Sequence, residues 1–173
     1  MEYWVLTMLA LENKLEAAAE SCTRQAEEAA LEQGGDAFSA FEKVIEINDK
    51  KRRIVNMKVL CDTVKGSLAP QESELLVAYA RHTAGELAAA LSESRLKVYR
   101  DVKRALSKAA KALARIGFKK EELERDYREL ALFSRTYNRL KRLKSKERTA
   151  AKPENVGGAA LANVQADGMQ ICA

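Results

Sequence analysis

The stretch that decides the fold runs from Thr83 to Leu106 and reads TAGELAAALSESRLKVYRDVKRAL. Thr83 followed three residues later by Glu86 is a capping box, which satisfies two otherwise unpaired backbone donors at a helix start. The run from Ser92 to Ser94 then interrupts the apolar pattern, and Ser94 is a suitable cap for a second helix. The segment therefore predicts a short helix, a three-residue turn and a longer helix.

The second of these helices has one apolar face, because its apolar residues recur at spacings of three, four or seven. They are Val98, Val102, Ala105, Ala109, Ala112 and Ile116. Gly117 is a natural C-terminal cap for this helix. On the short helix, Leu87 and Leu91 are expected to share the inner face, and the small Ala88 lets a second helix cross closely. The pattern predicts two helices packed on one core.

The opposite face of the longer helix is basic. Between residues 91 and 120 the chain has only two acids, Glu93 and Asp101, against ten bases, a net charge of +8. The bases are Arg95, Lys97, Arg100, Lys103, Arg104, Lys108, Lys111, Arg115, Lys119 and Lys120. A solvated helix face usually mixes charges of both signs. A face of one sign favours a polyanionic partner, most simply the phosphates of DNA or RNA.

The pattern extends on both sides of this stretch. Leu68-Ala69-Pro70-Gln71-Glu72 reads as a helix start with proline in the first turn. It is followed by Leu75, Leu76 and Tyr79, by Leu87, Ala88 and Leu91, and by Ser94, Val98, Val102, Ala105 and Leu106. In these positions residues 68–106 resemble region four of bacterial sigma factors and the related modules of phage-encoded transcription activators. The resemblance implies a helix-turn-helix fold.

The resemblance also implies a function, in which the helix from Ser94 enters the major groove of double-stranded DNA. The residues expected to contact DNA are Ser94, Arg95, Lys97, Tyr99, Arg100, Lys103 and Arg104. The chain would then be a DNA-binding transcription regulator of bacterial or phage origin. The alternative is a non-enzymatic α-helical interaction or scaffold protein, in which the same module only packs and its basic surface is solvated.

Two residues depart from the family pattern inside the turn. Ser92 stands where the family usually has glycine, and Glu93 stands where it usually has a buried isoleucine or valine. A buried carboxylate is costly unless it is solvated or paired. The sequence therefore predicts a distorted turn unless Glu93 reaches solvent or a cation.

The whole chain is expected to be all-α, with a helical hairpin followed by the helix-turn-helix module and a long C-terminal helix. Only two prolines and eight glycines interrupt its 173 residues, and alanine, leucine, glutamate, lysine and arginine dominate. The expected organisation is an acidic helical hairpin over 1–66, the helix-turn-helix module over 67–118, a basic C-terminal helix over 119–148 and a flexible tail over 149–173.

The hairpin should consist of one helix ending at Gly34-Gly35 and a second starting at Asp36. In the second helix a coiled-coil-like seam repeats every seven residues. Its members are Ile47, Ile54 and Cys61, joined by Val44, Met57 and Val64. Residues 1–47 have ten acids and three bases. These acids either temper polyanion binding or keep the hairpin soluble, and the hairpin suggests a homodimer or a contact with RNA polymerase.

The C-terminal helix is expected to be continuous over about 120–146. Its apolar stripe is Leu123, Tyr127, Leu130, Tyr137 and Leu140, with Phe133 beside it. Its end is basic, because residues 135–148 have seven bases and one acid. Tyr137 either stacks on nucleic acid or fills the core.

The residues that enzymes and metal sites need are missing from the sequence. His82 is the single histidine, there is no glycine-rich phosphate loop, and no Glu-x-x-His pattern occurs. Cys22, Cys61 and Cys172 lie far apart, with no spacing that indicates a disulfide framework or a zinc site. We therefore expect no enzyme activity, no cofactor and a reducing, cytoplasmic location.

The N-terminus is apolar but is not expected to be a membrane segment. It contains Glu2, lacks a basic region and is too short to span a bilayer. Its apolar residues instead fit one helix face, which consists of Trp4, Met8, Leu11 and Leu15. We expect no membrane partner and a helix that packs on the other helices.

Overall fold

The computed structural model describes residues 2–31 and 36–150. Within these ranges the chain forms seven α-helices and no β-strand, which confirms the all-α class. In the same ranges, no helix combines the length and the apolar composition needed to cross a membrane. The glycines predicted to end the first helix lie outside the described residues, and so does the predicted tail beyond Ala150.

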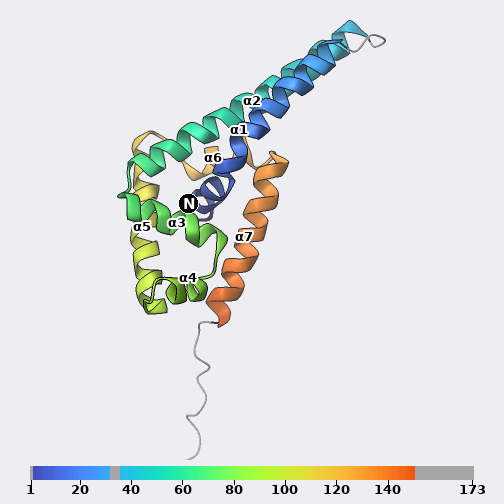
Figure 1. The fold of residues 1–173 in the computed structure, drawn as a ribbon. Coiled ribbons are helices and arrows are strands. Elements are labelled where there is room, and N and C mark those ends of the chain that lie inside the picture. Colours follow the sequence, from blue (N-terminus) through green and yellow to red (C-terminus); the bar gives the residue numbers. More distant parts are fainter. Residues whose placement is uncertain (1, 32–35, 151–173) are drawn as a thin grey trace, which may run out of the picture.

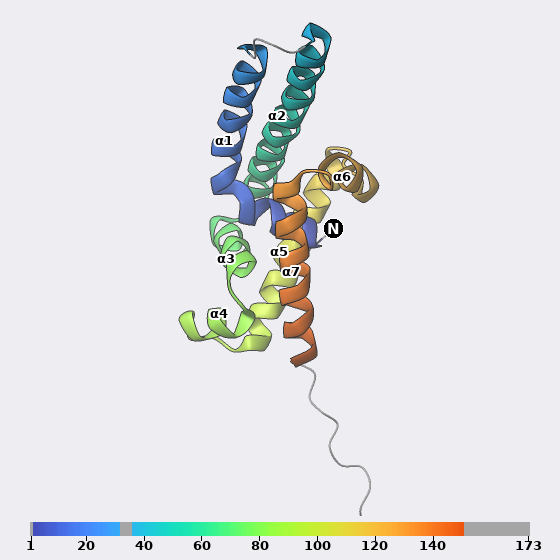
Figure 2. The same ribbon diagram turned by 90° about the vertical axis from the view of Figure 1, so that its right-hand side faces the viewer.

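The first two helices, α1 (Glu2–Leu31) and α2 (Ala37–Gly66), lie side by side as a hairpin. The outer half of this hairpin extends away from the other helices (Figures 1 and 2). Each helix has 30 residues and is therefore about 45 Å long. As predicted, Asp36 caps α2, because its carboxylate accepts a hydrogen bond from the Phe38 N–H at 3.3 Å. The predicted seam is buried at Ile54, Met57, Cys61 and Val64.

Acidic residues of α1 pair with lysines of α2 near the base of the hairpin. Lys65 Nζ donates to Glu12 Oε1 at 2.6 Å, and Lys58 Nζ lies 3.5 Å from Glu16 Oε2. These two acids therefore stabilise the hairpin itself.

Three helices follow the hairpin: α3 (Pro70–Arg81), α4 (Ala84–Ala90) and α5 (Arg95–Arg115). The predicted short helix and long helix are thus α4 and α5. The buried face of α5 consists of Val98, Val102, Ala105, Leu106, Ala109 and Leu113. The predicted stripe is correct as far as Ala109 but wrong at Ile116, which is 47% exposed. Because the chain turns away at Gly117 (φ +86°), Leu113 is the last core residue of this helix.

The prediction of one continuous C-terminal helix is wrong. The chain forms α6 (Lys120–Tyr127) and α7 (Ala131–Ala150), separated by a turn. The Leu130 N–H donates to the Tyr127 carbonyl at 3.0 Å and closes this turn. The Leu130 carbonyl then accepts the Ser134 N–H at 2.9 Å, which starts α7.

The break between α6 and α7 brings aromatic side chains of both helices onto the N-terminus of α1. The Trp4 ring stacks on Phe133 with centroids 4.2 Å apart, and its edge meets Tyr127 at 6.3 Å. Phe133 is 2% exposed and belongs to the core, although the predicted stripe left it to one side. Burial of these three rings explains the turn, because each contributes a large apolar area.

The N-terminal half of α1 runs through the centre of the molecule. The predicted face of Trp4, Met8, Leu11 and Leu15 is buried, which confirms that this segment packs on the other helices. One cluster of buried apolar residues includes members of all seven helices. The base of the hairpin and the other helices therefore share a core.

We expect alkaline pH to destabilise the protein through Cys61, which is fully buried on α2. Burial, and then the nearby Glu12 and Asp62 carboxylates, raise the pKa of the Cys61 thiol from 9.0 to about 12. The folded state therefore keeps this proton at a pH where the unfolded state loses it, so stability falls as pH rises from 9 towards 12. Between about pH 8 and about pH 10.5 the loss should be about 2 kcal/mol. Urea unfolding followed by circular dichroism measures it.

The control for this prediction is Cys61→Ala, which has no thiol to titrate. Its stability should fall less over the same pH interval. Tyr127 still contributes there, because burial raises its pKa from 10.0 to about 12. An equal fall in Cys61→Ala and the parent protein would contradict the assignment to Cys61.

Candidate nucleic-acid interface

The junction between α4 and α5 is built from local hydrogen bonds. Thr83 Oγ1 accepts the Glu86 N–H at 3.2 Å, and Glu86 Oε2 accepts the Thr83 N–H at 2.7 Å, which confirms the predicted capping box. At the start of α5, Ser94 Oγ accepts the Lys97 N–H at 3.2 Å, as predicted. Both helix starts are therefore fixed by residues within three positions of each other.

The turn itself closes as a Schellman motif. The Glu93 N–H donates to the Ala88 carbonyl at 2.9 Å, and the Ser92 N–H donates to the Ala89 carbonyl at 3.3 Å. Ser92 has a φ of +52°, in the left-handed region that favours glycine. Glu93 is exposed and pairs with Lys97, so its carboxylate is both solvated and paired. The turn is thus regular.

The sequence predicted that Leu91 lies on the inner face of the short helix α4, and this prediction is wrong. It is 53% exposed, whereas Leu87 is buried. Leu91 is the C-terminal cap of α4, where the backbone already leaves the helix. The apolar spacing therefore overestimated how far the short helix continues.

We expect Ser92→Gly to stabilise the protein by about 0.5–1 kcal/mol, because glycine adopts a positive φ without strain. Thermal unfolding should show a rise of about 2 °C. The same motif ends α5, where Gly117 has a φ of +86°. The reciprocal variant Gly117→Ser should therefore lower the melting temperature. A lower melting temperature for Ser92→Gly would contradict this view of the turn.

Most cations of α5 lie on the side turned away from its buried stripe; Arg95 instead lies in line with that stripe, at the exposed start of the helix. Of the residues predicted to contact DNA, Ser94, Arg95, Lys97, Arg100, Lys103 and Arg104 are exposed. Ser94 also serves as the helix cap. The structure thus places six of the seven predicted residues at the exposed cap and along the first three turns of α5, and five of them carry a positive charge.

Acidic residues neutralise only part of this face. Arg104 lies 3.4 Å from Asp101 and 3.8 Å from Glu72, and Lys108 Nζ donates to Glu72 at 2.6 Å. The hydrogen bond from Lys108 holds the pKa of the Glu72 carboxyl below its usual value. In contrast, Arg100, Lys103 and Lys111 have no acidic partner within residues 2–31 and 36–150, and their charge is available to a ligand.

Tyr99, the seventh predicted residue, is half-buried at the side of α5. Its ring meets Tyr79 of α3 edge-on at 6.4 Å, and the Arg95 guanidinium lies 5.9 Å from its centroid. Its hydroxyl is enclosed, and burial with the neighbouring Glu147 raises the pKa of Tyr99. The side chain therefore packs between helices.

The sequence did not single out Leu96, which lies on the same basic face and is 67% exposed. Ser107 is also exposed there, two turns after Arg100. Helical spacing at 100° per residue could have found both, because Leu96, Arg100, Lys103 and Ser107 fall on one side of α5. An exposed leucine among cations could contact a thymine methyl group.

The sequence also missed a buried ion pair that fixes the start of α4. Lys144 and Glu147 of α7 have side chains only 5% and 4% exposed, and Lys144 Nζ lies 3.3 Å from Glu147 Oε2. Lys144 also donates to the His82 carbonyl at 2.7 Å and lies 3.6 Å from the Tyr79 ring centroid. Glu147 Oε1 accepts the Ala84 N–H, the first of α4. We call this pair the Lys144–Glu147 clamp.

Because of the clamp, Lys144 is not one of the surface cations at the basic end of α7. Burial lowers the pKa of Lys144, and the Glu147 carboxylate acts in the opposite direction. The bases of α7 that can contact a ligand are the exposed ones, which include Arg135, Arg139, Lys141 and Arg142. Tyr137 is partly buried and stacks on Phe133 at 6.0 Å, so it belongs to the core.

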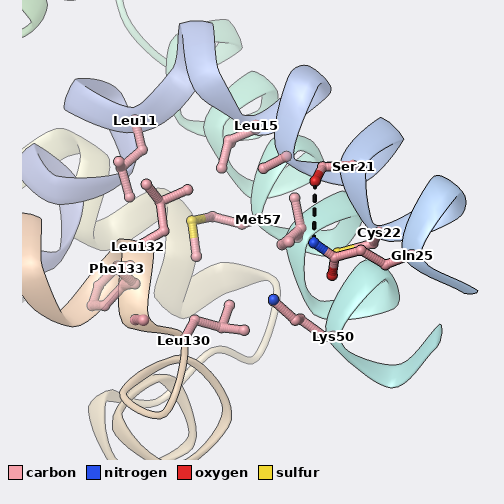
Figure 3. Close-up of a pocket in the computed structure, with 13 residues that line it drawn as sticks. Leu11, Leu15, Ser21, Cys22, Gln25, Lys50, Met57, Leu130, Leu132 and Phe133 are labelled. Carbon is pink, nitrogen blue, oxygen red and sulfur yellow. Dashed lines mark hydrogen bonds between the residues drawn. The ribbon is translucent and has the colours of Figure 1, made fainter. Parts of the chain in front are cut away.

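An apolar cavity of about 220 Å³ lies between α1, α2 and the start of α7 (Figure 3). Leu11, Leu15, Met57 and Phe133 are among the residues that line it, and Lys50 reaches it from α2. In the described part of the chain, no group of three or more His, Cys, Asp or Glu residues could hold a metal ion. The cavity does not form part of the basic face of α5.

The geometry of α5 is the main basis for a functional assignment. Comparisons with protein-family models, curated proteins and solved structures found no match to this chain.

Proposed function

We propose that the protein is a transcription regulator that binds double-stranded DNA with the basic face of α5. The observation that carries the proposal is the set of exposed cations Arg100, Lys103 and Lys111, which pair with no acid in the described part of the chain and lie opposite the buried stripe of the same helix. Cations held on a rigid helix attract phosphates and release counterions when they bind. The resemblance of residues 68–106 to sigma-factor region four specifies duplex DNA and the major groove.

The residue types on this face support two kinds of contact. Arginines such as Arg100 can bond to guanine bidentately, whereas lysines such as Lys103 mostly hold phosphate. Leu96 adds an apolar group for a thymine methyl. Lys97 and Arg104 flank these residues, and Arg95 adds charge at the start of the helix. The face can therefore both position the duplex and read bases.

The remaining helices would act as a support. The capping box at Thr83 and the Lys144–Glu147 clamp hold α4, and the turn at Ser92 fixes the angle between α4 and α5. A recognition helix needs such support, because base contacts require side chains held close to their binding geometry. The proposal places the protein in the cytoplasm of a bacterial or phage-infected cell.

A random-duplex selection with the purified protein tests the proposal. The expected result is enrichment of a short sequence motif, followed by tight binding to that motif and weaker binding to scrambled duplexes. Recovery of no duplex, even at low salt, would contradict the proposal and favour the alternative of an interaction or scaffold protein.

A further inference from the structure

The helix α2 has a second apolar stripe on the side turned away from its buried seam. Its apolar members are between 44% and 66% exposed: Phe38, Phe41, Ile45, Val55 and Val59. Together with Asn48 and Arg52 they are spaced alternately by three and four residues from Phe38 to Val59. This is the spacing of a coiled-coil seam, and it lies on a helix whose other face already packs on α1.

The stripe is large enough to pack against a second helix. Its apolar side chains expose roughly 500 Å² in one copy, at the upper end for a monomeric protein. Two such stripes, with the stems of the flanking lysines and arginines, reach roughly the 1,200 Å² of a specific interface. The stripe is therefore large enough to hold one helix of similar length.

We propose that the occupant is α2 of a second copy of this chain, packed antiparallel. The stripe has an apolar cluster at each end and a polar centre, Asn48 and Arg52. Antiparallel packing in one register places Ile45 opposite Val55 of the second copy and Asn48 opposite Arg52 of the second copy. Apolar residues then meet apolar residues, and the two Arg52 guanidinium groups avoid the direct contact that parallel packing would force.

The charge along α2 independently favours the antiparallel direction. Residues 36–49 have four acids and one base, a net charge of −3, whereas residues 50–62 have five bases and one acid, a net charge of +4. Antiparallel packing sets the acidic half of each copy beside the basic half of the other, while parallel packing sets like charges together. The dimer would therefore weaken in high salt without being abolished.

Sedimentation of the full chain without DNA tests the interface separately from DNA binding. The parent protein should be a dimer at about 50 µM, and Phe41→Glu should be a monomer with unchanged helix content. The matched control is Leu31→Glu, since Leu31 is 76% exposed on α1 and lies off the stripe. It should remain dimeric. A monomeric parent protein, or a dimeric Phe41→Glu, would overturn the proposal.

Disulfide cross-linking tests the direction in a Cys172→Ser background. The double variant Ile45→Cys/Val55→Cys should form a covalent dimer on mild oxidation, and the background protein should not. The single variant Ile45→Cys should stay uncross-linked, because antiparallel packing separates the two copies of residue 45 by about 15 Å along the helix. The proposal would be overturned if the single variant cross-linked efficiently and the double variant gave no more covalent dimer than the single variant. That result would show parallel packing.

Discussion

Replacing both Arg100 and Lys103 by glutamate will reduce the affinity for duplex DNA by about 100-fold or more at moderate salt. Each substitution removes one attractive contact and introduces one charge that repels phosphate. The fold should be unaffected, because both side chains are exposed on α5 and neither pairs with an acid in the part of the chain that the structure describes. Fluorescence anisotropy with a labelled duplex measures the loss, and circular dichroism checks the helix content.

The matched control for this variant is Lys14→Glu/Arg24→Glu on α1. It makes the same change in net charge at two exposed positions of the hairpin. Affinity should fall by only a few-fold, through the general effect of net charge. Equal losses in the two double variants would show that net charge alone drives binding, and that α5 has no special role.

Replacing Glu147 by alanine will destabilise the protein by about 3–5 kcal/mol. The substitution leaves the Lys144 ammonium buried without its counterion and leaves the Ala84 N–H at the start of α4 without its acceptor. In a protein of this size the melting temperature should fall by about 10 °C. Thermal and urea unfolding of the variant measure both quantities.

A double-mutant cycle with Lys144→Met distinguishes the clamp from simple loss of packing. Methionine keeps most of the lysine stem volume and removes the charge. The double variant Lys144→Met/Glu147→Ala should be more stable than the sum of the two single losses predicts, because no charge remains buried alone. Additive losses, or a loss below about 1 kcal/mol for Glu147→Ala, would contradict the ion-pair account.

The features that the sequence predicted depend on residues close together in the chain. The capping box at Thr83, the cap at Ser94 and the stripe from Val98 to Ala109 each follow from side chains within one helical turn or from helical periodicity. The sequence also showed that Ser92 stands where the sigma-factor pattern usually has glycine. Its positive φ shows why this position of the turn favours glycine.

The features that the sequence missed depend on contacts between distant segments. The turn before α7 forms where Phe133 and Tyr127 meet Trp4, more than 120 residues earlier in the chain. Lys144 looked like one more cation of a basic helix, and only packing against Tyr79 and His82 shows that it is buried. Helical periodicity cannot distinguish a continuous helix from two helices joined by a short turn, and it carries no information about tertiary partners.

The salt dependence of duplex binding tests the central claim most directly. If α5 docks on DNA so that Arg95, Lys97, Arg100, Lys103 and Arg104 each neutralise a phosphate, the number of phosphates neutralised is about five. The logarithm of the association constant should then fall with the logarithm of salt concentration with a slope of about −4.5, and of about −3 for the Arg100→Glu/Lys103→Glu variant. A slope near zero, or no binding at about 50 mM salt, would contradict the assignment of α5 as a DNA-binding helix.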